Sequence, residues 1–475
     1  MAKPKDASAL YLDDPARFRE RMTAALSAAI PWQDMAAAEV NAERESAWLL
    51  CEALACDPDI LGRFAEALTA DGFAGSLRGP KLLYLALTSR LLSRPVSLVM
   101  KAPSSAGKSY AVERTTAYFP EEAFYALSSM SPKALAYDTE PLKHRILIVY
   151  EAAGAADETA SYLLRTLLSE GHIRHQTVEA TKDGVRPRLV ERDGPTGVIL
   201  TTTAPRLHPE NETRMLSIPV DDSQAQTRNV MLAIATGRRA ALPEDDVNEA
   251  TWHALQTWLR LSSHAVEIPY AVMLAELIPP VAVRLRRDFA TVLNLIRAHA
   301  ILQQATRART EDGSILATID DYLIVRSLIV DLVSEGVEAT VSPIVRETVA
   351  AVRDLTANAN DTASVQQLVT HLQIDKAAVS RRVSLSRQLG YLVSLEDKKG
   401  KPARIVLGAP MPDDLVILPT ADVLAEIMYS ATDATTDDVE PPTALNVCPG
   451  CEAPLYASIS QHCGMCGLCR ERSAA

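Results

Sequence analysis

Short apolar runs alternate with segments of helical periodicity through the middle of the chain. The runs, which are typical of buried strands, lie at residues 97–100, 123–127, 145–150 and 198–203. Apolar residues recur at helical spacing between them, as at 110–118 and 160–170. Strands that alternate with helices predict an α/β fold, an open sheet with its ligand at the carboxyl ends of the strands.

Helical patterns dominate both sides of this region. Before it, residues 1–75 predict helices at 17–30, 36–54 and 60–68, and a further helix at 81–92 leads into the first strand. After it, two long amphipathic helices are expected at 283–303 and 319–332. Residues 337–408 then predict helices at 342–355, 365–372 and 376–389 and strands at 391–394 and 403–407. That order is typical of a winged helix-turn-helix.

The first apolar run opens into a loop of small residues that ends in Gly107-Lys108-Ser109. A strand, a small-residue loop and a helix form a phosphate-binding loop, in which backbone N–H groups and a helix N-terminus surround phosphate oxygens. Lys108 would contact the β- and γ-phosphates of ATP, and the Ser109 hydroxyl would bind Mg²⁺. Ala102 stands where the pattern has its first glycine. The predicted nucleotide-binding residues are Ala102, Pro103, Ser104, Ser105, Ala106, Gly107, Lys108 and Ser109.

Glu151 follows the apolar run 145–150 and is the candidate for activating the attacking water. The preceding residue is Tyr150, where a second carboxylate is usual, so metal binding would rely on Ser109, water and Glu151 itself. The alternative is that Glu151 caps a helix beginning in the small residues that follow it.

Residues 173–191 predict a β-hairpin whose turn is Asp183-Gly184. Lys182 lies at its tip, and Arg186 and Arg188 lie on the returning strand. Such a basic hairpin could hold a nucleic-acid backbone without reading bases, although a solvated hairpin would look the same.

The order of phosphate loop, Glu-ended strand, hairpin, Thr-ended strand and Asn211-Glu212-Thr213-Arg214 resembles an AAA+ ATPase of the helicase clade. Over residues 95–335 it is most similar to minichromosome maintenance (MCM) helicases and their viral and mobile-element relatives. The resemblance implies that Lys182 contacts DNA. It also implies that Thr202 or Thr203 senses the γ-phosphate, and that Arg214 reaches a neighbouring subunit's nucleotide.

The same resemblance puts a second phosphate-sensing arginine on Arg287, at the start of a lid helix that also carries Ala298-His299-Ala300. Arg284 and Arg286 are alternatives for that role. A surface ion pair with Glu210 or Glu212 is the alternative role for Arg214. His299 is expected to be a packed helix residue.

The third helix of the winged unit begins at Lys376 and is capped by Asp375. It carries Arg381 and Arg382, and the wing carries Lys398 and Lys399. These cations favour DNA, although winged helices also bind proteins.

The C-terminal region predicts an acidic linker at 409–445 and a metal-binding tail at 446–475. Two C-x-x-C pairs, Cys448 with Cys451 and Cys463 with Cys466, suit tetrahedral Zn²⁺. Cys469 or His462 could replace one ligand, and an iron–sulfur cluster is a lesser alternative. The remaining cysteines, Cys51 and Cys56, are expected to be inert core residues.

Composition narrows the remaining choices. The 475 residues carry a net charge of −12, so DNA binding must depend on local basic patches. The absence of a signal-peptide core or a membrane-spanning run predicts a cytoplasmic protein without a membrane partner. The expected division is 1–75 helical, 76–240 ATPase core, 241–336 lid and 337–408 winged helix, followed by the linker and the tail.

These features together predict an ATP-hydrolysing DNA helicase or translocase that works as a homo-oligomeric ring, expected to be a hexamer. The lack of an N-terminal DNA-binding barrel favours a phage or mobile-element replication protein over a cellular MCM protein. The alternatives are a nucleotide-switched DNA-binding regulator and a sequence-specific initiator, both without motor activity.

Overall fold

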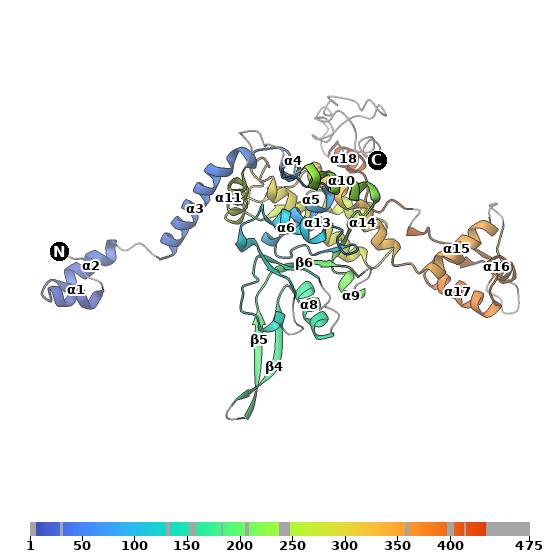
Figure 1. Ribbon diagram of the computed structural model, residues 1–475, viewed down its shortest axis with the longest axis horizontal. Coiled ribbons are helices and arrows are strands. Elements are labelled where there is room, and N and C mark those ends of the chain that lie inside the picture. The colour runs from blue at the N-terminus through green and yellow to red at the C-terminus, as the bar shows by residue number, and fades with distance from the viewer. Residues whose placement is uncertain are drawn as a thin grey trace.

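The computed structural model describes residues 6–28, 32–129, 134–151, 158–181, 184–204, 209–236, 248–356, 361–396, 403–412 and 415–433. Figure 1 shows a central body with three projections. Helices α1 (Ala7–Asp13) and α2 (Phe18–Ala28) lie at one end, the unit containing α15 to α17 lies at the other, and a hairpin extends below. Of the helices that the structure describes, none is long and apolar enough to cross a membrane.

Five parallel strands form the sheet of the central body, in the order β2-β3-β6-β1-β7. Their bounds are β1 Leu98–Lys101, β2 Phe124–Leu127, β3 Arg145–Val149, β6 Thr196–Thr202 and β7 Leu216–Pro219. Leu98 of β1 pairs with Ile199 of β6 on one side and Leu216 of β7 on the other. Helices cover both faces of the sheet, which explains why the inner strands are continuous apolar runs.

The main hydrophobic core joins segments from distant parts of the sequence. It contains the end of α3 (Trp32–Ala55), α4 (Ile60–Ala70), α5 (Arg78–Thr88) and the sheet, together with helices of the region 249–338. Phe64 of α4, for example, packs edge-on against Tyr118 and Trp252 at ring-centroid distances of 5.0 and 6.1 Å. The boundary expected at residue 75 therefore does not separate a helical domain, because α4 and the end of α3 are part of the core.

The remaining helices and strands of the body connect or cover the sheet. They are α6 (Lys108–Thr116), α7 (Ala134–Tyr137), α8 (Glu158–Glu170), α9 (Pro209–Glu212), α10 (Gln224–Thr236), α11 (Glu249–Arg260), β8 (Val266–Glu267), α12 (Ala271–Leu277), α13 (Leu285–Leu302), β9 (Ile315–Leu316) and α14 (Ile319–Glu338). Helices α13 and α14 are joined by a buried cluster in which His299 Nδ1 and Asp321 Oδ1 lie 2.7 Å apart.

The hairpin consists of β4 (Ile173–Thr181) and β5 (Gly184–Arg192), which project from the body between α8 and β6 (Figure 1). Ile173 and Arg192 pair at its base and are both buried. The Arg192 guanidinium donates hydrogen bonds to the carbonyl oxygens of Asp138 and Glu140. The hairpin is therefore attached to the segment before β3 as well as to its own neighbours in sequence.

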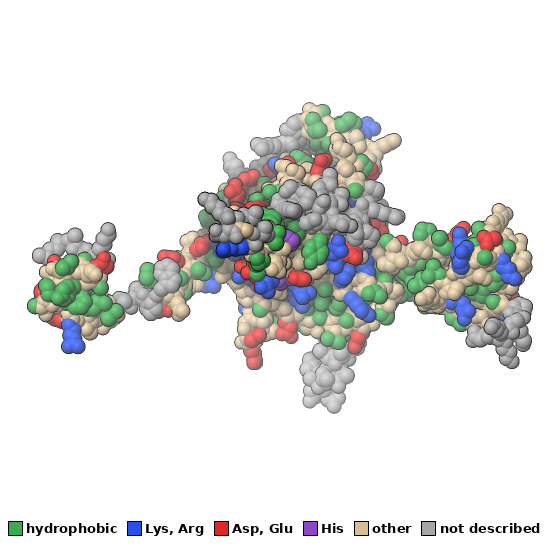
Figure 2. Space-filling model, turned by 90° about the horizontal axis from the view of Figure 1, so that it is seen from below, with side chains coloured by type: hydrophobic (Ala, Val, Ile, Leu, Met, Phe, Trp, Pro, Cys, Tyr) green, Lys and Arg blue, Asp and Glu red, His purple; other side chains and the backbone are tan. Residues whose placement is uncertain are grey.

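A unit of three helices and two strands, with a hydrophobic cluster of its own, follows α14. It is named the winged unit after the winged helix-turn-helix that the sequence predicts there. It contains α15 (Pro343–Leu355), α16 (Val365–Leu372), α17 (Lys376–Gln388), β10 (Leu392–Ser394) and β11 (Ile405–Leu407). The Asp375 side chain accepts a hydrogen bond from the Ala378 N–H at 2.9 Å, which caps α17. Figure 2 shows Lys and Arg side chains on this unit and exposed hydrophobic side chains on the N-terminal helix pair.

The chain returns from the winged unit to the central core. The sequence predicts a linker at 409–445, whereas Ile417, Leu418 and Leu424 are buried in the main core and α18 spans Ala421–Asp433. The Tyr322 hydroxyl of α14 donates to the Pro419 carbonyl at 2.6 Å. The prediction of a linker was wrong for residues 415–433, because it rested on the acidic, proline-rich composition of the stretch after them and not on the apolar residues of 415–428. Residues 434–445 lie outside the described residues.

The two cysteines outside the tail differ in environment. Cys51 is buried as expected, but Cys56 is exposed, because it follows the last residue of α3, where the chain turns at the surface. Both are free thiols.

Candidate functional site

The loop between β1 and α6 has the geometry of a phosphate loop. Ser105 and Gly107 both have positive φ angles, 66° and 87°, and Gly107 is the N-cap of α6. The loop therefore turns tightly into the helix, whose first N–H groups have no acceptor within the helix and are suited to phosphate oxygens. The positive φ angle of Gly107 explains why the sequence pattern has glycine at this position, since L-residues rarely adopt such an angle.

Lys108 lies within this loop rather than in solvent. Its side chain is buried, with 7% of its surface exposed, and Nζ donates to the carbonyl oxygens of Ala102 at 2.8 Å and Pro103 at 2.7 Å. The two carbonyl oxygens offset part of the cost of removing the Lys108 ammonium group from water. They carry no net negative charge to balance its positive charge. A bound phosphate would supply the negative charge.

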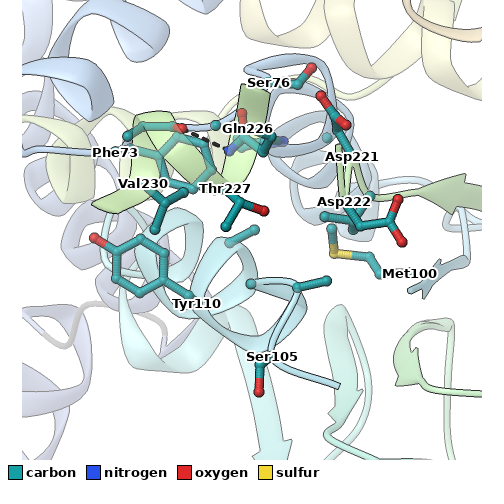
Figure 3. Close-up of a pocket in the computed structure, with 18 of the residues that line it drawn as sticks. Phe73, Ser76, Met100, Ser105, Tyr110, Asp221, Asp222, Gln226, Thr227 and Val230 are labelled. Carbon is teal, nitrogen blue, oxygen red and sulfur yellow. Dashed lines mark hydrogen bonds between the residues drawn. The ribbon is translucent and has the colours of Figure 1, made fainter. Parts of the chain in front are cut away.

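A cavity of about 940 Å³ opens beside the loop (Figure 3). Loop residues Pro103 to Gly107 form part of its lining, together with segments from α10, from the end of β7 and from the turn before α5. This volume suits a nucleotide-sized ligand whose phosphates lie on the loop. The cavity and the phosphate loop thus form one site.

Figure 3 shows Phe73, Tyr110 and Val230 on one side of the cavity and Asp221 and Asp222 on the other, with Ser105 beneath. The Phe73 and Tyr110 rings are parallel, with centroids 5.9 Å apart. The sequence pattern missed these residues because they come from separate segments. The one available signal was Asp221-Asp222 directly after an apolar stretch, at the carboxyl end of what proves to be β7.

Glu151 lies at the end of β3, but β6 separates that strand from β1. Its backbone N–H donates to Thr201 Oγ1 at 3.1 Å, and its φ angle of 57° is in the left-handed region. The carboxylate itself is exposed. Thr201, which the sequence analysis passed over, therefore links the end of β6 to Glu151, whereas Thr202 accepts a hydrogen bond from Ala204 N–H and Thr203 is exposed.

Tyr150 cannot replace the missing metal-side carboxylate. Its side chain is half-buried, and burial, reinforced by the negative charge of Glu113, raises the pKa of the phenol to about 12. The phenol therefore stays protonated at neutral pH and is a poor ligand for Mg²⁺. Ser109, in the first turn of α6, is the loop residue suited to holding the ion.

Three arginines gather away from the cavity. Arg287 at the start of α13 donates to Thr213 Oγ1 at 2.9 Å, and the next residue, Arg214, donates to Ser169 Oγ at 2.7 Å. Burial lowers the pKa of Arg214, and the nearby charges of Arg287 and Arg165 lower it further. Arg214 and Arg287 therefore lie together, and neither lines the cavity. Their segment is close to the loop in the fold, because Glu212 pairs with Lys101, the residue directly before the phosphate loop.

The two alternatives for Arg287 have different surroundings. Arg284 Nε donates to Asp288 at 2.9 Å and its guanidinium packs against Gly336 of α14. Arg286 is exposed. Arg287, in contrast, is joined to the segment of Arg214 by its hydrogen bond to Thr213.

The expected DNA-binding side chains lie on two separate projections. Arg186 and Arg188 are exposed on β5, and Lys376 and Arg381 are exposed on α17, but Arg382 pairs with Glu347 at 2.6 Å. Lys182 at the hairpin tip and Lys398 and Lys399 of the wing lie outside the described residues.

The predicted zinc ligands also lie outside the described residues, namely Cys448, Cys451, Cys463 and Cys466, with the alternatives His462 and Cys469. The residues that the structure describes contain no group of three or more metal-ligating side chains.

Comparison with known proteins supports the nucleotide site. Residues 78–261 match a family model described as the MTBMA_p00010 P-loop domain. This segment is similar to a P-loop domain. The match includes the phosphate loop, the sheet, the hairpin and α11.

Two other comparisons add nothing to the P-loop match. No curated protein matches the chain. Among solved structures, the Aeropyrum pernix Orc1 protein in complex with DNA covers 81% of this chain and 97% of its own, with 13% sequence identity and a TM-score of 0.23. A TM-score this low carries no inference about fold or function, so the assignment rests on the P-loop match.

Proposed function

We propose that the protein is an AAA+ ATPase that couples ATP hydrolysis to movement along DNA, in a ring of identical subunits. The finer proposal, from the resemblance to MCM-like helicases, is that it unwinds DNA during replication of a phage or mobile element. The P-loop match and the phosphate-loop geometry support nucleotide binding. The motor itself is supported by the position of the hairpin.

The hairpin is connected directly to the strand that contacts Glu151. Strand β5 ends at Arg192, β6 begins at Thr196, and Thr201 near the end of β6 accepts the Glu151 N–H. A change at Glu151 on hydrolysis would therefore act on the strand whose other end holds the hairpin. This connection is the observation that carries the proposal, because it joins the hydrolysis site to a projection suited to DNA.

The arginines support the ring. Arg214 and Arg287 lie together, joined through Thr213, and neither lines the chain's own cavity. A guanidinium that reaches a γ-phosphate from a neighbouring subunit stabilises the charge of the transition state. We propose that this pair completes the neighbour's site in the ring.

The test is the ATPase rate of the full chain with and without single-stranded DNA. The proposal expects a rate that DNA stimulates and that Glu151→Gln reduces by about 10²-fold or more, in line with the loss of a catalytic base. ATP binding by the variant, measured by calorimetry, should stay close to that of the wild type. A wild-type chain that binds ATP but does not turn it over would contradict the motor.

One observation favours a second function, a nucleotide-switched DNA-binding regulator. The protonated Tyr150 phenol stands where a metal-side carboxylate would assist hydrolysis. In a switch, ATP binding alone would change DNA affinity, and DNA binding would depend on the winged unit. Deletion of the winged unit, residues 340–411, would then abolish DNA binding, whereas the motor would keep the binding that the hairpin provides.

A further inference from the structure

An ion pair joins the phosphate loop to the segment that carries Arg214. Lys101 is the last residue of β1 and directly precedes the loop, and its Nζ donates to the Glu212 carboxylate. Glu212 is the last residue of α9 and directly precedes Thr213 and Arg214. The exposed fractions are 15% for the Lys101 side chain and 26% for that of Glu212, so salt screens this pair less than a fully exposed one. The pair therefore holds the Arg214 segment at the carboxyl end of β1.

The backbone directly after Lys101 is held by Lys108. The Lys108 ammonium group donates to the carbonyl oxygens of Ala102 and Pro103, the two residues that follow Lys101. A triphosphate on the loop would compete for the same ammonium group, and a charged acceptor forms a stronger hydrogen bond than a neutral carbonyl. Nucleotide binding would therefore release the first residues of the loop and change the backbone next to Lys101.

The two arginines lie on the other side of the ion pair. Thr213, the residue after Glu212, accepts a hydrogen bond from Arg287 at the start of α13. Arg214, the next residue, donates to Ser169 Oγ of α8. A change in the position of Glu212 would therefore move the acceptor of Arg287 and the backbone of Arg214 together.

We propose that the Lys101–Glu212 pair is a positioning contact, through which the nucleotide in a chain's own phosphate loop sets the orientation of these two arginines. This inference rests on the proposed function, in which the arginines serve a neighbouring subunit. It deepens that function, because it names the contact by which nucleotide bound to one subunit changes turnover in the next. Neither Lys101 nor Glu212 lines the cavity, so neither is assigned a contact with the nucleotide.

Stability alone explains this ion pair poorly. Replacing a buried ion pair with apolar residues of similar volume is often neutral or stabilising, so an apolar contact between β1 and α9 would hold the fold equally well. The two charges also occupy the positions directly before the phosphate loop and directly before Thr213 and Arg214. This placement fits a link between the two segments better than a role in stability.

The first test is the dependence of the steady-state ATPase rate of the full chain on ATP concentration. We expect the wild type to be cooperative, with a Hill coefficient above about 1, because coupled sites respond together. Lys101→Met removes the charge and keeps a long apolar side chain, so it should lower the Hill coefficient to about 1. ATP affinity, measured by calorimetry, should stay close to that of the wild type. Glu212→Gln should have the same effect, and the double variant no further one, since each change removes the same contact.

Arg145→Met is the matched control. Arg145 is the first residue of β3 and pairs with Glu140, with side-chain exposed fractions of 17% and 44%. The control removes a similarly buried cation from an ion pair on the same sheet, but at the amino end of a strand. It should lower Tm at least as much as Lys101→Met and leave the Hill coefficient unchanged. Equal losses of cooperativity in the two variants would overturn the proposal in favour of a general effect of stability.

Hydrogen exchange tests the contact without hydrolysis. A non-hydrolysable ATP analogue at saturation should change amide exchange in residues 209–216 of the wild type and should not change it in Lys101→Met. If the wild type fails to hydrolyse ATP, the proposed function is wrong, and the exchange measurement still tests the contact. A wild-type segment that does not respond to the analogue would overturn the proposal. So would the same response in wild type and variant, or a Hill coefficient that Lys101→Met leaves unaltered.

Discussion

Two groups of cationic side chains in this protein suit phosphate, and their surroundings differ. Lys108 is buried in the phosphate loop, lies beside the cavity and is held by two carbonyl oxygens of the same loop. Arg214 is partly buried and Arg287 is exposed, and neither lines that cavity. The proposed function assigns to the first a phosphate bound by its own chain and to the second the phosphate of a neighbouring subunit.

The largest effect is expected at the buried group. Lys108→Ala removes the ammonium that faces the phosphates, so ATP affinity and turnover should both fall, by about 10²–10³-fold for the loss of one preorganised donor. Calorimetry with ATP and a steady-state ATPase assay measure the two losses. Unchanged ATP affinity would show that the cavity does not hold the phosphates on this loop.

Substitution of Arg214 is expected to reduce ATP turnover without reducing ATP binding. Arg214→Ala should keep ATP affinity within about threefold but reduce turnover by about 10³-fold, which is the low end for a transition-state arginine. Mixing this variant with Lys108→Ala tests whether the arginine acts between subunits. Assemblies in which an intact loop faces an intact arginine should regain activity, and a mixture as inactive as its components would place Arg214 in its own chain's chemistry.

A smaller effect is expected when only the backbone of the loop is strained. Gly107 has φ +87°, and an added Cβ would meet nothing within 4 Å. Gly107→Ala should therefore cost about 1–2 kcal/mol of strain, which would lower Tm by several degrees and weaken ATP binding.

Gly313 provides the matched control for that variant. It has φ +84°, also meets nothing within 4 Å, and lies in the turn between α13 and α14. Gly313→Ala should lower Tm to a similar extent and leave ATP binding unchanged. Equal losses of ATP affinity in both variants would mean that strain acts through global stability rather than through the phosphate loop.

The smallest expected effect is on stability in acid, through the contact between His299 of α13 and Asp321 of α14. Arg287 lies in the first turn of α13. Burial of Asp321 works to raise its pKa, but the hydrogen bond and charge of His299 and the charge of Arg307 outweigh it and leave the pKa below the usual 3.8. A carboxyl group with a lowered pKa stabilises the fold above about pH 4, and this contribution is lost as the pH falls through the lowered value. Acid unfolding of Asp321→Asn, followed by circular dichroism, should accordingly depend less on pH in the acid range than that of the wild type. Parallel acid-unfolding curves for the two proteins would contradict this role.

Local pattern was enough to predict much of the fold. The strands β1, β2, β3 and β6, the hairpin and the helices of the winged unit were all expected within a few residues of their bounds. The predicted turn was displaced, because Gly184 begins β5 and pairs with Thr181. Each depends on periodicity or turn chemistry that neighbouring residues define. Strand β7 was missed because Leu216–Pro219 is short and follows a segment interpreted only for its arginine.

The phosphate loop could be predicted from the chain alone, since the positive φ at Gly107 and the position of Lys108 depend on adjacent residues. Its surroundings could not: Phe73 beside Tyr110, Asp221 and Asp222 at the cavity, and Thr201 rather than Thr202 against Glu151 all depend on tertiary packing. The same holds for Arg287 beside the segment of Arg214 and for residues 415–433 in the core. The reason is physical, because strand order and helix packing join residues that are 50 and 74 positions apart, as in the Glu151 and Arg287 hydrogen bonds, and no local pattern records such contacts.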